Sequence, residues 1–371
     1  MRRWLVAPQE FKGTLTATEA AAALADGLRQ GAPDAELDIA PLADGGPGTV
    51  DALLAGVGGE RVRLTVHGPL GRPVEAAYGL LDGGRTAVIE MAAASGLSLL
   101  TPSERDPRRA STSGTGELMR AALERGCERL ILALGGSATN DGGTGALAAL
   151  GFRFLDAHGH PLPPGGAALR QLARVDTSGQ HPRLAQVELL VANDVTAPLL
   201  GPDGASRLFG PQKGADAAAV EELEAALARL AEVVSPALAK TPGAGAAGGF
   251  GFGLAALARG RFVSGYGLVA RTLRLPERLA AADAVLTGEG RYDRQTALGK
   301  GPGALAREAH ALGRCTVMFA GAVAADVEAS GSPFDEVVEV SPSAPPGATA
   351  AEALRLAGAR WASRQATLMK P

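Results

Sequence analysis

Residues 135–145 read GGSATNDGGTG, and this stretch decides the class of fold that the sequence predicts. It follows the apolar run LILAL at 130–134, which predicts a buried strand, and precedes ALAAL at 146–150, which predicts a helix. A strand that ends in glycines and small polar residues before a helix is typical of anion-binding loops in α/β proteins, because free backbone N–H groups at the helix start point at the ligand. The alternative is a tight strand-to-helix turn with an N-cap.

The same succession of strand, glycine-bearing loop and helix occurs elsewhere in the chain. Residues 4–7 predict a first strand, and residues 37–40 predict a second one that ends before the loop PLADGGPGT. Residues 284–287 predict a later strand, which leads into GEGRYD at 288–293. Repeated units of this kind favour an α/β architecture with a mainly parallel sheet, in which ligands gather at the carboxyl ends of the strands. Residues 17–30 predict a helix whose Thr16 has a capping-box spacing to Glu19.

Between residues 60 and 100 the pattern changes. Apolar and polar residues alternate over 61–66 and over 86–91, and Asp82-Gly83-Gly84 predicts a hairpin-type turn between strands. We therefore expect two α/β domains. One is a Rossmann- or flavodoxin-like parallel-sheet domain built from residues 1–60 plus 280–371, and the other is an inserted domain with a mixed sheet, residues 61–279. A long helix is predicted over 217–238.

Composition limits the class of partner. The 371 residues are 46% hydrophobic and 20% charged, values of a globular protein. A net charge of −3 and an aromatic content of 4% argue against a nucleic-acid partner. No apolar run approaches the roughly 18 residues of a membrane span. We expect a cytoplasmic protein, a monomer or homodimer, that binds small molecules and neither nucleic acid nor membranes.

Charged side chains near the glycine loops are the candidates for chemistry. Three of the five lysines, Lys12, Lys213 and Lys300, lie in the contexts FKG, QKGA and GKGP, where a compact point charge suits a phosphate. Asp194 follows the predicted strand 187–192. Glu289 and Asp293 lie four residues apart in the turn after another strand, where carboxylates suit a metal ion or a hydroxyl.

The motifs together resemble the type I glycerate kinase family. The matching segments are APQEFKGTL (7–15), ADGGPGT (43–49), EMAAASGL (90–97), GTGEL (114–118), GGSATNDGG (135–143), DVTAPLLGPDGASRLFGPQKGA (194–215), PGAGAAGG (242–249) and GEGRYD (288–293). They occur in order over nearly the whole chain. The resemblance implies two α/β domains with the active site in the cleft between them, and ATP-dependent phosphorylation of D-glycerate to 2-phosphoglycerate.

We assign roles to the matching residues on this basis. The chain has no Walker A loop, and phosphoryl transfer depends on positioning and charge neutralisation. The cofactors expected are ATP and Mg²⁺. The predicted site comprises catalytic Lys12, Asp44, Asp194 and Asp293; phosphate- and nucleotide-binding Gly135, Gly136, Ser137, Asn140, Asp141 and Lys213; substrate-binding Glu289, Arg291 and Lys300; and metal-binding Asp194 and Glu289.

Three of the motifs depart from the family's usual pattern, and two other functions stay open. Gln9 and Glu10 replace an Asp-Ser pair, Pro47 replaces a glutamate, and Ala197 replaces an asparagine. One alternative is therefore a catalytically altered homologue that binds a small hydroxy acid or nucleotide without turnover. The other is a nicotinamide-dependent dehydrogenase, because residues 243–248 match G-x-G-x-x-G. That match is weak, since no clear strand precedes it.

Overall fold

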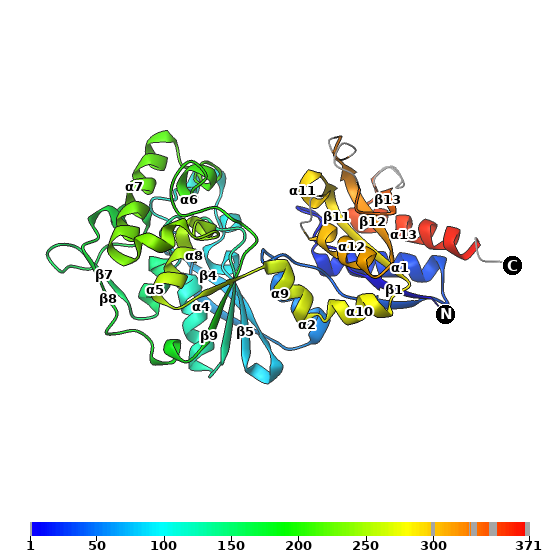
Figure 1. The fold of residues 1–371 in the computed structure, drawn as a ribbon, viewed down its shortest axis with the longest axis horizontal. Helices are drawn as coiled ribbons and strands as arrows, with labels where there is room; N and C mark the ends of the chain where they lie inside the picture. The colour runs from blue at the N-terminus through cyan, green and yellow to red at the C-terminus, as the bar shows by residue number, and fades with distance from the viewer. Residues whose placement is uncertain (1, 298–300, 326, 328–331, 341–346, 368–371) are drawn as a thin grey trace. The chain divides into compact units, whose positions relative to one another are not determined.

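The computed structural model describes residues 2–297, 301–325, 327, 332–340 and 347–367 (Figure 1). The chain divides into two compact units. Unit 1 consists of Met1–Asp44, Asp51–Gly58 and Tyr266–Pro371, and unit 2 of Gly45–Val50 and Gly59–Gly265. Each unit is described by itself below.

The centre of unit 1 is a five-stranded sheet in the order β13-β12-β11-β1-β2, in which every pair of neighbours is parallel. The strands are β1 (Arg3–Val6), β2 (Glu36–Ile39), β11 (Ala284–Tyr292), β12 (Cys315–Val323) and β13 (Glu336–Glu339). The helices are α1 (Ala17–Gly31), α2 (Thr49–Val57), α9 (Gly265–Thr272), α10 (Leu275–Ala281), α11 (Arg294–Ala297), α12 (Pro302–Ala311) and α13 (Ala350–Thr367). A parallel sheet needs helical crossovers, and these helices supply them.

Alternation along β12 shows how both faces of this sheet are covered. Val317 and Phe319 belong to the apolar cluster that includes residues of α1 and α13. Met318 and Ala320 belong to a second cluster, with Ala306 of α12. Successive side chains of a strand point to opposite faces, so a strand buried on both faces has a continuous apolar sequence.

Helices α1 and α13 pack closely because glycines lie between them. A Cβ on Gly27 would be 2.0 Å from the carbonyl oxygen of Arg355, and one on Gly31 would be 2.3 Å from that of Ala359. The predicted capping box at the start of α1 is present, because the Thr16 hydroxyl accepts from Glu19 N and the Glu19 carboxylate accepts from Thr16 N. These contacts join a helix near the start of the chain to one more than 300 residues later.

Unit 2 contains a six-stranded mixed sheet in the order β10-β9-β6-β5-β4-β3. The first four strands in this order are parallel to one another, whereas β4 is antiparallel to both β3 and β5. The strands are β3 (Glu60–His67), β4 (Pro73–Leu81), β5 (Thr86–Glu90), β6 (Arg129–Ala133), β9 (Glu188–Ala192) and β10 (Arg261–Val263); β7 (Arg153–Leu155) and β8 (Arg174–Asp176) form a separate antiparallel pair. The predicted fold class, with one parallel and one mixed sheet, is confirmed.

The helices of unit 2 pack around a core formed by residues of this sheet and of the helices themselves. They are α3 (Ala92–Ser95), α4 (Ser113–Glu124), α5 (Thr144–Ala149), α6 (Ala205–Phe209), α7 (Ala217–Val234) and α8 (Ala246–Leu257). The prediction that α7 extends to residue 238 is wrong. The helix ends at Val234 because Pro236 has no N–H to continue the α-helical ladder, and a 3₁₀ turn over Pro236–Lys240 follows.

The predicted turn between β4 and β5 is present at residues 82–84. All three residues have positive φ, at 54° for Asp82, 67° for Gly83 and 89° for Gly84. Two glycines and an aspartate suit this left-handed turn because they adopt positive φ more readily than other residues. Within the described ranges, no helix combines the length and apolar character that crossing a lipid bilayer requires.

Candidate active site

The loop 135–145 connects β6 to α5, as the sequence predicts, and Asp141 holds it in shape. The Asp141 side chain is fully buried and accepts hydrogen bonds from Thr112 N at 2.8 Å, Thr112 Oγ1 at 2.9 Å, Gly143 N at 3.0 Å and Gly145 N at 3.2 Å. Burial raises the pKa of this carboxyl, and the hydrogen bonds oppose that rise. Asp141 thus ties the loop to the start of α4 and has no exposed surface to offer a ligand.

Asn140 and Lys213 lie below the surface on the inner side of the same loop. Asn140 is fully buried and donates from Nδ2 to Ser206 Oγ at 3.1 Å. Lys213 is 2% exposed, and its Nζ donates to Ser137 Oγ at 2.9 Å and to the carbonyl oxygen of Thr139 at 2.7 Å. Burial lowers the pKa of Lys213 to about 7, although the Asp141 carboxylate opposes this. The structure therefore brings Ser137, Asn140, Asp141 and Lys213 together.

Gly135 and Gly136 are the accessible part of the loop, and they lie against the predicted motif ADGG. Gly135 N donates to the carbonyl oxygen of Gly45 at 3.1 Å, and a Cβ on Gly135 would be 2.5 Å from Gly46 Cα. Gly136 is exposed and has a φ of +76°. A side chain at Gly135 would push these two loops apart, so glycine is required by the close approach.

The glycine-rich segment 243–249 packs against this loop and does not form a dinucleotide-binding fold. It follows the 3₁₀ turn Pro236–Lys240 and not a strand. Gly248 has a φ of +66°, and its Cβ would be 2.1 Å from the carbonyl oxygen of Thr139. Its own carbonyl accepts from Gly142 N at 3.0 Å. The G-x-G-x-x-G match is thus a packing feature, and the strand–turn–helix context of a dehydrogenase fingerprint is missing from this segment.

Asp194 follows the carboxyl end of β9 in the same unit. Its side chain is exposed, and Oδ1 accepts from Gly265 N at 3.0 Å. β9 is the neighbour of β6, and a Cβ on Gly45 would lie 3.1 Å from the carbonyl oxygen of Ala192, the last residue of β9. The ends of β6 and β9 and the 45–46 loop therefore meet at one edge of the sheet, as expected for ligand-binding loops in parallel sheets.

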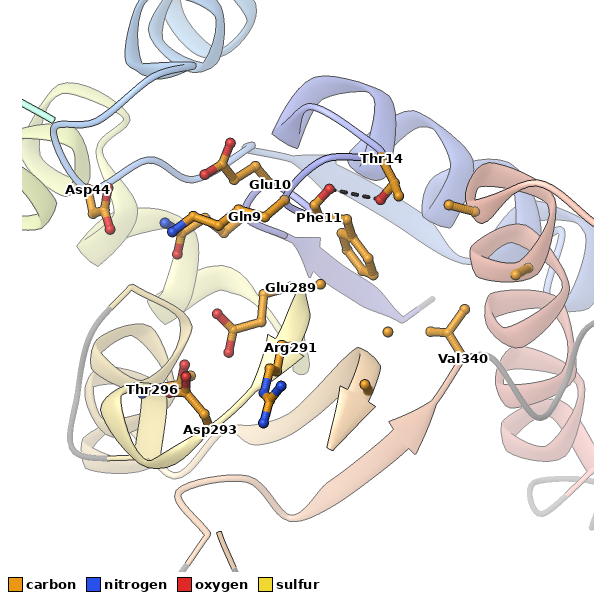
Figure 2. A pocket seen from close by; sticks show the side chains of 16 residues that line it. Gln9, Glu10, Phe11, Thr14, Asp44, Glu289, Arg291, Asp293, Thr296 and Val340 are labelled. Carbon is orange, nitrogen blue, oxygen red and sulfur yellow. Dashed lines mark hydrogen bonds between the residues drawn. The ribbon is translucent and has the colours of Figure 1, made fainter. Parts of the chain in front are cut away.

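Unit 1 has its own pocket, with a volume of about 520 Å³. Figure 2 shows the side chains that line it: Glu10 from the loop after β1, Asp44 from the segment after β2, and Glu289, Arg291 and Asp293 from the end of β11 and just beyond it. Lys12 also lines the pocket. The structure thus brings five predicted site residues together here: Lys12, Asp44, Glu289, Arg291 and Asp293.

The charges around this pocket and burial in it perturb the ionisation of two carboxyls, Glu289 and Glu10. Burial raises the pKa of Glu289 to about 7; a hydrogen bond with Thr296 and the charge of Lys12 oppose the rise, whereas Asp293 and Asp44 add to it. Oε1 of Glu289 is buried and has no hydrogen-bond partner among the described residues. Burial also raises the pKa of Glu10. The charge of Lys12 again opposes the rise, and the charge of Asp44 adds to it. An acid with a pKa near 7 in a pocket can exchange a proton at neutral pH.

The glycines of GEGRYD let the loop after β1 approach β11. A Cβ on Gly290 would lie 3.0 Å from Lys12 N and 3.1 Å from Phe11 Cα. A Cβ on Gly288 would lie 2.7 Å from the carbonyl oxygen of Phe319 on β12. Gly288 and Gly290 therefore let β11 pack closely against β12 and against the loop after β1. Glu289, between these two glycines, points into the pocket.

The pocket offers hard oxygen ligands for a magnesium ion. Among the described residues, no group of three or more His, Cys, Asp or Glu side chains is arranged to hold a metal by itself. Mg²⁺ is usually bound by one or two carboxylates, with water and substrate phosphates completing the shell. Glu289, with its unpartnered Oε1, and Asp293 fit that requirement. Asp194, also predicted as a metal ligand, belongs to unit 2.

The pocket residues that the predicted site leaves out include Glu10, and Thr296, which hydrogen-bonds with Glu289. In the sequence, Glu10 stands out only as a departure from the family pattern, and Thr296 lies beyond the motif GEGRYD at 288–293. The spacing of Thr296 from Asp293 could have indicated that the two residues lie close together, because a residue three positions after Asp293 at the start of a helix can face back to that aspartate. In the structure, Thr296 N lies 3.4 Å from Asp293 Oδ1. Lys300 lies outside the described residues.

The chain is similar to known proteins over nearly its whole length. The sequence model of the "Glycerate kinase family" matches residues 4–369. A glycerate kinase of Halalkalibacterium halodurans is 45% identical over 333 residues, covering 89% of this chain and 88% of that protein. A glycerate 2-kinase of Escherichia coli K12 is 45% identical over 327 residues, covering 87% and 86%.

A solved structure agrees with these relatives. The crystal structure of a protein from Salmonella typhimurium LT2, provisionally assigned as glycerate kinase 2, superimposes with a TM-score of 0.87. It is 41% identical, and the match covers 99% of this chain and 98% of that one. The prediction of a kinase is confirmed by the family match and these relatives. The protein described here belongs to the glycerate kinase family.

Proposed function

We propose that this protein transfers the γ-phosphoryl group of ATP to D-glycerate and forms 2-phosphoglycerate, with Mg²⁺ as the metal and in the cytoplasm. The observation that carries the proposal is the pocket of unit 1, where Lys12 and Arg291 share one cavity with Glu10, Asp44, Glu289 and Asp293. Cations suit the carboxylate of glycerate, and carboxylates suit its hydroxyl groups and a metal ion. The E. coli relative, a glycerate 2-kinase, supports the choice of product.

The residues of unit 1 would act on the acceptor. Lys12 and Arg291, with Lys300, would bind the glycerate carboxylate by charge. Asp44 would orient the hydroxyl that attacks. Glu289 and Asp293, together with Asp194 of unit 2, would hold Mg²⁺, which in phosphoryl transfer neutralises charge on the phosphate oxygens.

The loop of unit 2 would bind the nucleotide. Gly135 and Gly136 present backbone at its accessible end, and Ser137 adds a hydroxyl. Asn140 and Asp141 would act from within by holding the loop in shape, since both are fully buried. Because residues 1–60 and 280–371 and residues 61–279 are expected to form separate domains, we propose that acceptor and nucleotide meet in the cleft between them.

One assay tests the reaction and its product. Purified protein is incubated with D-glycerate and Mg-ATP, ADP release is followed by a coupled assay, and the product is identified by ³¹P and ¹³C NMR. We expect 2-phosphoglycerate, loss of turnover on addition of EDTA, and its recovery with excess Mg²⁺. The variants Asp293→Asn and Asp194→Asn should each lower kcat at least about tenfold, since each removes a charge from phosphoryl transfer.

A matched control separates these effects from general damage. Glu339 on β13 is an exposed carboxylate of the same unit as Asp293, and Glu339→Gln should keep wild-type turnover. Near wild-type kcat in both aspartate variants would refute the assigned roles. Formation of 3-phosphoglycerate would refute the regiochemistry, and nucleotide binding without any product would favour the catalytically altered homologue.

A further inference from the structure

The buried ammonium group of Lys213 has an effect on Ser137 that follows from the chemistry of the two groups. Lys213 lies at the end of the 3₁₀ turn Pro211–Lys213, and its Nζ is 2.9 Å from Ser137 Oγ and 2.7 Å from the Thr139 carbonyl oxygen. An ammonium group can only donate hydrogen bonds. Both oxygens are therefore acceptors in these contacts.

The Ser137 hydroxyl must then direct its own proton elsewhere. A hydroxyl carries one proton and two lone pairs, and one lone pair of Ser137 is used by Lys213. Within the described residues, Ser137 Oγ makes no second hydrogen bond. Ser137 as a whole residue is 8% exposed, and it adjoins Gly136, which is exposed. The proton is available to an acceptor outside the protein, at the accessible end of the loop.

Lys213 itself is poorly placed to contact such an acceptor. It is 2% exposed, and two of its three ammonium protons are used by the loop. Burial of a charged group is costly, and an apolar side chain of similar length would fill the same space without that penalty. The charge of the Asp141 carboxylate offsets part of the penalty. Because burial lowers the pKa of Lys213 to about 7, its charged form is present at and below neutral pH, and there it lies beside Ser137 at an energetic disadvantage.

We propose that Lys213 is a positioning residue that fixes the Ser137 hydroxyl as an outward donor, so that Ser137, and not Lys213, contacts a phosphate of the nucleotide. This inference rests on the proposed function, and it replaces the direct lysine–phosphate contact expected from the motif QKGA. A hydroxyl group that is polarised by an adjacent ammonium group is a stronger hydrogen-bond donor to an anion than an isolated hydroxyl group.

A double-mutant cycle tests the proposal, with nucleotide affinity as the measured quantity. Dissociation constants for ADP and for a non-hydrolysable ATP analogue are measured by calorimetry for the wild type, Ser137→Ala, Lys213→Met and the double variant. Ser137→Ala should weaken both about 10- to 100-fold, the range for a hydrogen bond to a charged group. Lys213→Met should give a similar loss, and the double variant should bind no worse than the weaker single variant. Losses that multiply in the double variant would overturn the proposal, because Lys213 would then act independently of Ser137.

Two further variants guard against a folding defect. Ser137→Thr keeps the hydroxyl and should restore affinity to within about threefold of the wild type. Thr144→Val removes a hydroxyl from the same loop, but that hydroxyl points inward and donates to the Asp141 carbonyl oxygen at 2.8 Å; affinity should stay within about twofold. If Lys213→Met does not fold, Ser137→Ala decides alone, and an unchanged affinity in it overturns the proposal.

The wild type separates this inference from the function on which it rests. If it forms phosphoglycerate and Ser137→Ala binds nucleotide normally, only the inference fails. If the wild type binds nucleotide, Ser137→Ala weakens that binding as expected, and the wild type forms no phosphoglycerate, only the proposed reaction fails. If it binds no nucleotide, both fail.

Discussion

Replacing Glu289 by glutamine should stabilise unit 1 at alkaline pH and not at acid pH. Burial raises the pKa of Glu289 from an ordinary value of 4.5 to about 7, so the folded pocket favours the neutral carboxyl. Below the ordinary value, the group is protonated in both states and imposes no penalty. Between pH 4.5 and 7 the folded state binds more protons than the unfolded one, so stability falls as pH rises, and above pH 7 the full penalty persists.

The expected magnitude follows from the two pKa values. A gap of about 2.5 pH units corresponds to about 3.4 kcal/mol, and roughly a quarter of it is already present at pH 5. The Glu289→Gln variant should therefore gain up to about 2.5 kcal/mol more free energy of unfolding at pH 8 than at pH 5. Partial exposure of the side chain to water in the pocket reduces this to about 2 kcal/mol.

The protein carries its own probe for this experiment. Its two tryptophans, Trp4 and Trp361, both lie in unit 1 with ring centroids 5.1 Å apart, so tryptophan fluorescence follows the unfolding of that unit. Urea titrations at pH 5 and pH 8, with EDTA present to remove divalent metal, give the four free energies. Their double difference cancels any pH-independent effect of the glutamine.

A control and a functional measurement complete the design. Glu339→Gln, at an exposed carboxylate of the same unit, should change stability equally at both pH values. Glu289→Gln should lose turnover while it gains stability, because the charge that destabilises the pocket is the one proposed to bind the metal. An equal effect of Glu289→Gln at pH 5 and pH 8, or a larger destabilisation at pH 8, would refute the reasoning.

Three further perturbations, and a control for the last of them, have expected outcomes. Lys12→Met removes a charge that lowers the pKa of Glu289, so the fall in stability with pH should extend to higher pH, as measured by the same fluorescence titrations. Thr16→Ala removes the capping box of α1 and should cost unit 1 about 1 kcal/mol in that assay; no loss would contradict the capping role. Gly248→Ala should cost unit 2 more than about 2 kcal/mol by circular dichroism, because its Cβ would lie 2.1 Å from a carbonyl oxygen. Gly201 also has a positive φ, but a Cβ at this position would meet no other atom. Gly201→Ala should therefore lower the free energy of unfolding by only about 1 kcal/mol.

Local sequence patterns predicted the elements of the fold because each pattern reports a local cause. The 15 residues of α1 begin where the spacing of Thr16 and Glu19 places them, and three turn residues with positive φ join β4 to β5 as Asp82-Gly83-Gly84 indicates. The error at the end of α7 has an equally local cause, since Pro236 outweighs the helical spacing of the residues around it.

The orientation of site side chains could not be predicted from the sequence, because long-range packing decides it. Asp141 was expected to face a ligand, yet it faces inward because Thr112, 29 positions earlier, supplies two donors. Lys213 lies 76 positions from Ser137, and only the folded core shows that its ammonium group contacts that hydroxyl. A motif shows which side chains are available, but a neighbouring element decides which way they point.

The contact between α1 and α13 has a consequence for the synthesis of the protein. The apolar face of α1, with Leu24 and Leu28, is buried in a cluster that includes Leu354 and Trp361 of α13. At about 5–20 residues per second, a ribosome delivers α13 some tens of seconds after α1. Unit 2 is complete at residue 265 and can fold in that interval. The first 44 residues meanwhile keep in water the edge of β1 that later pairs with β11, and the apolar face of α1, so we expect the nascent chain to bind a chaperone near the ribosome exit.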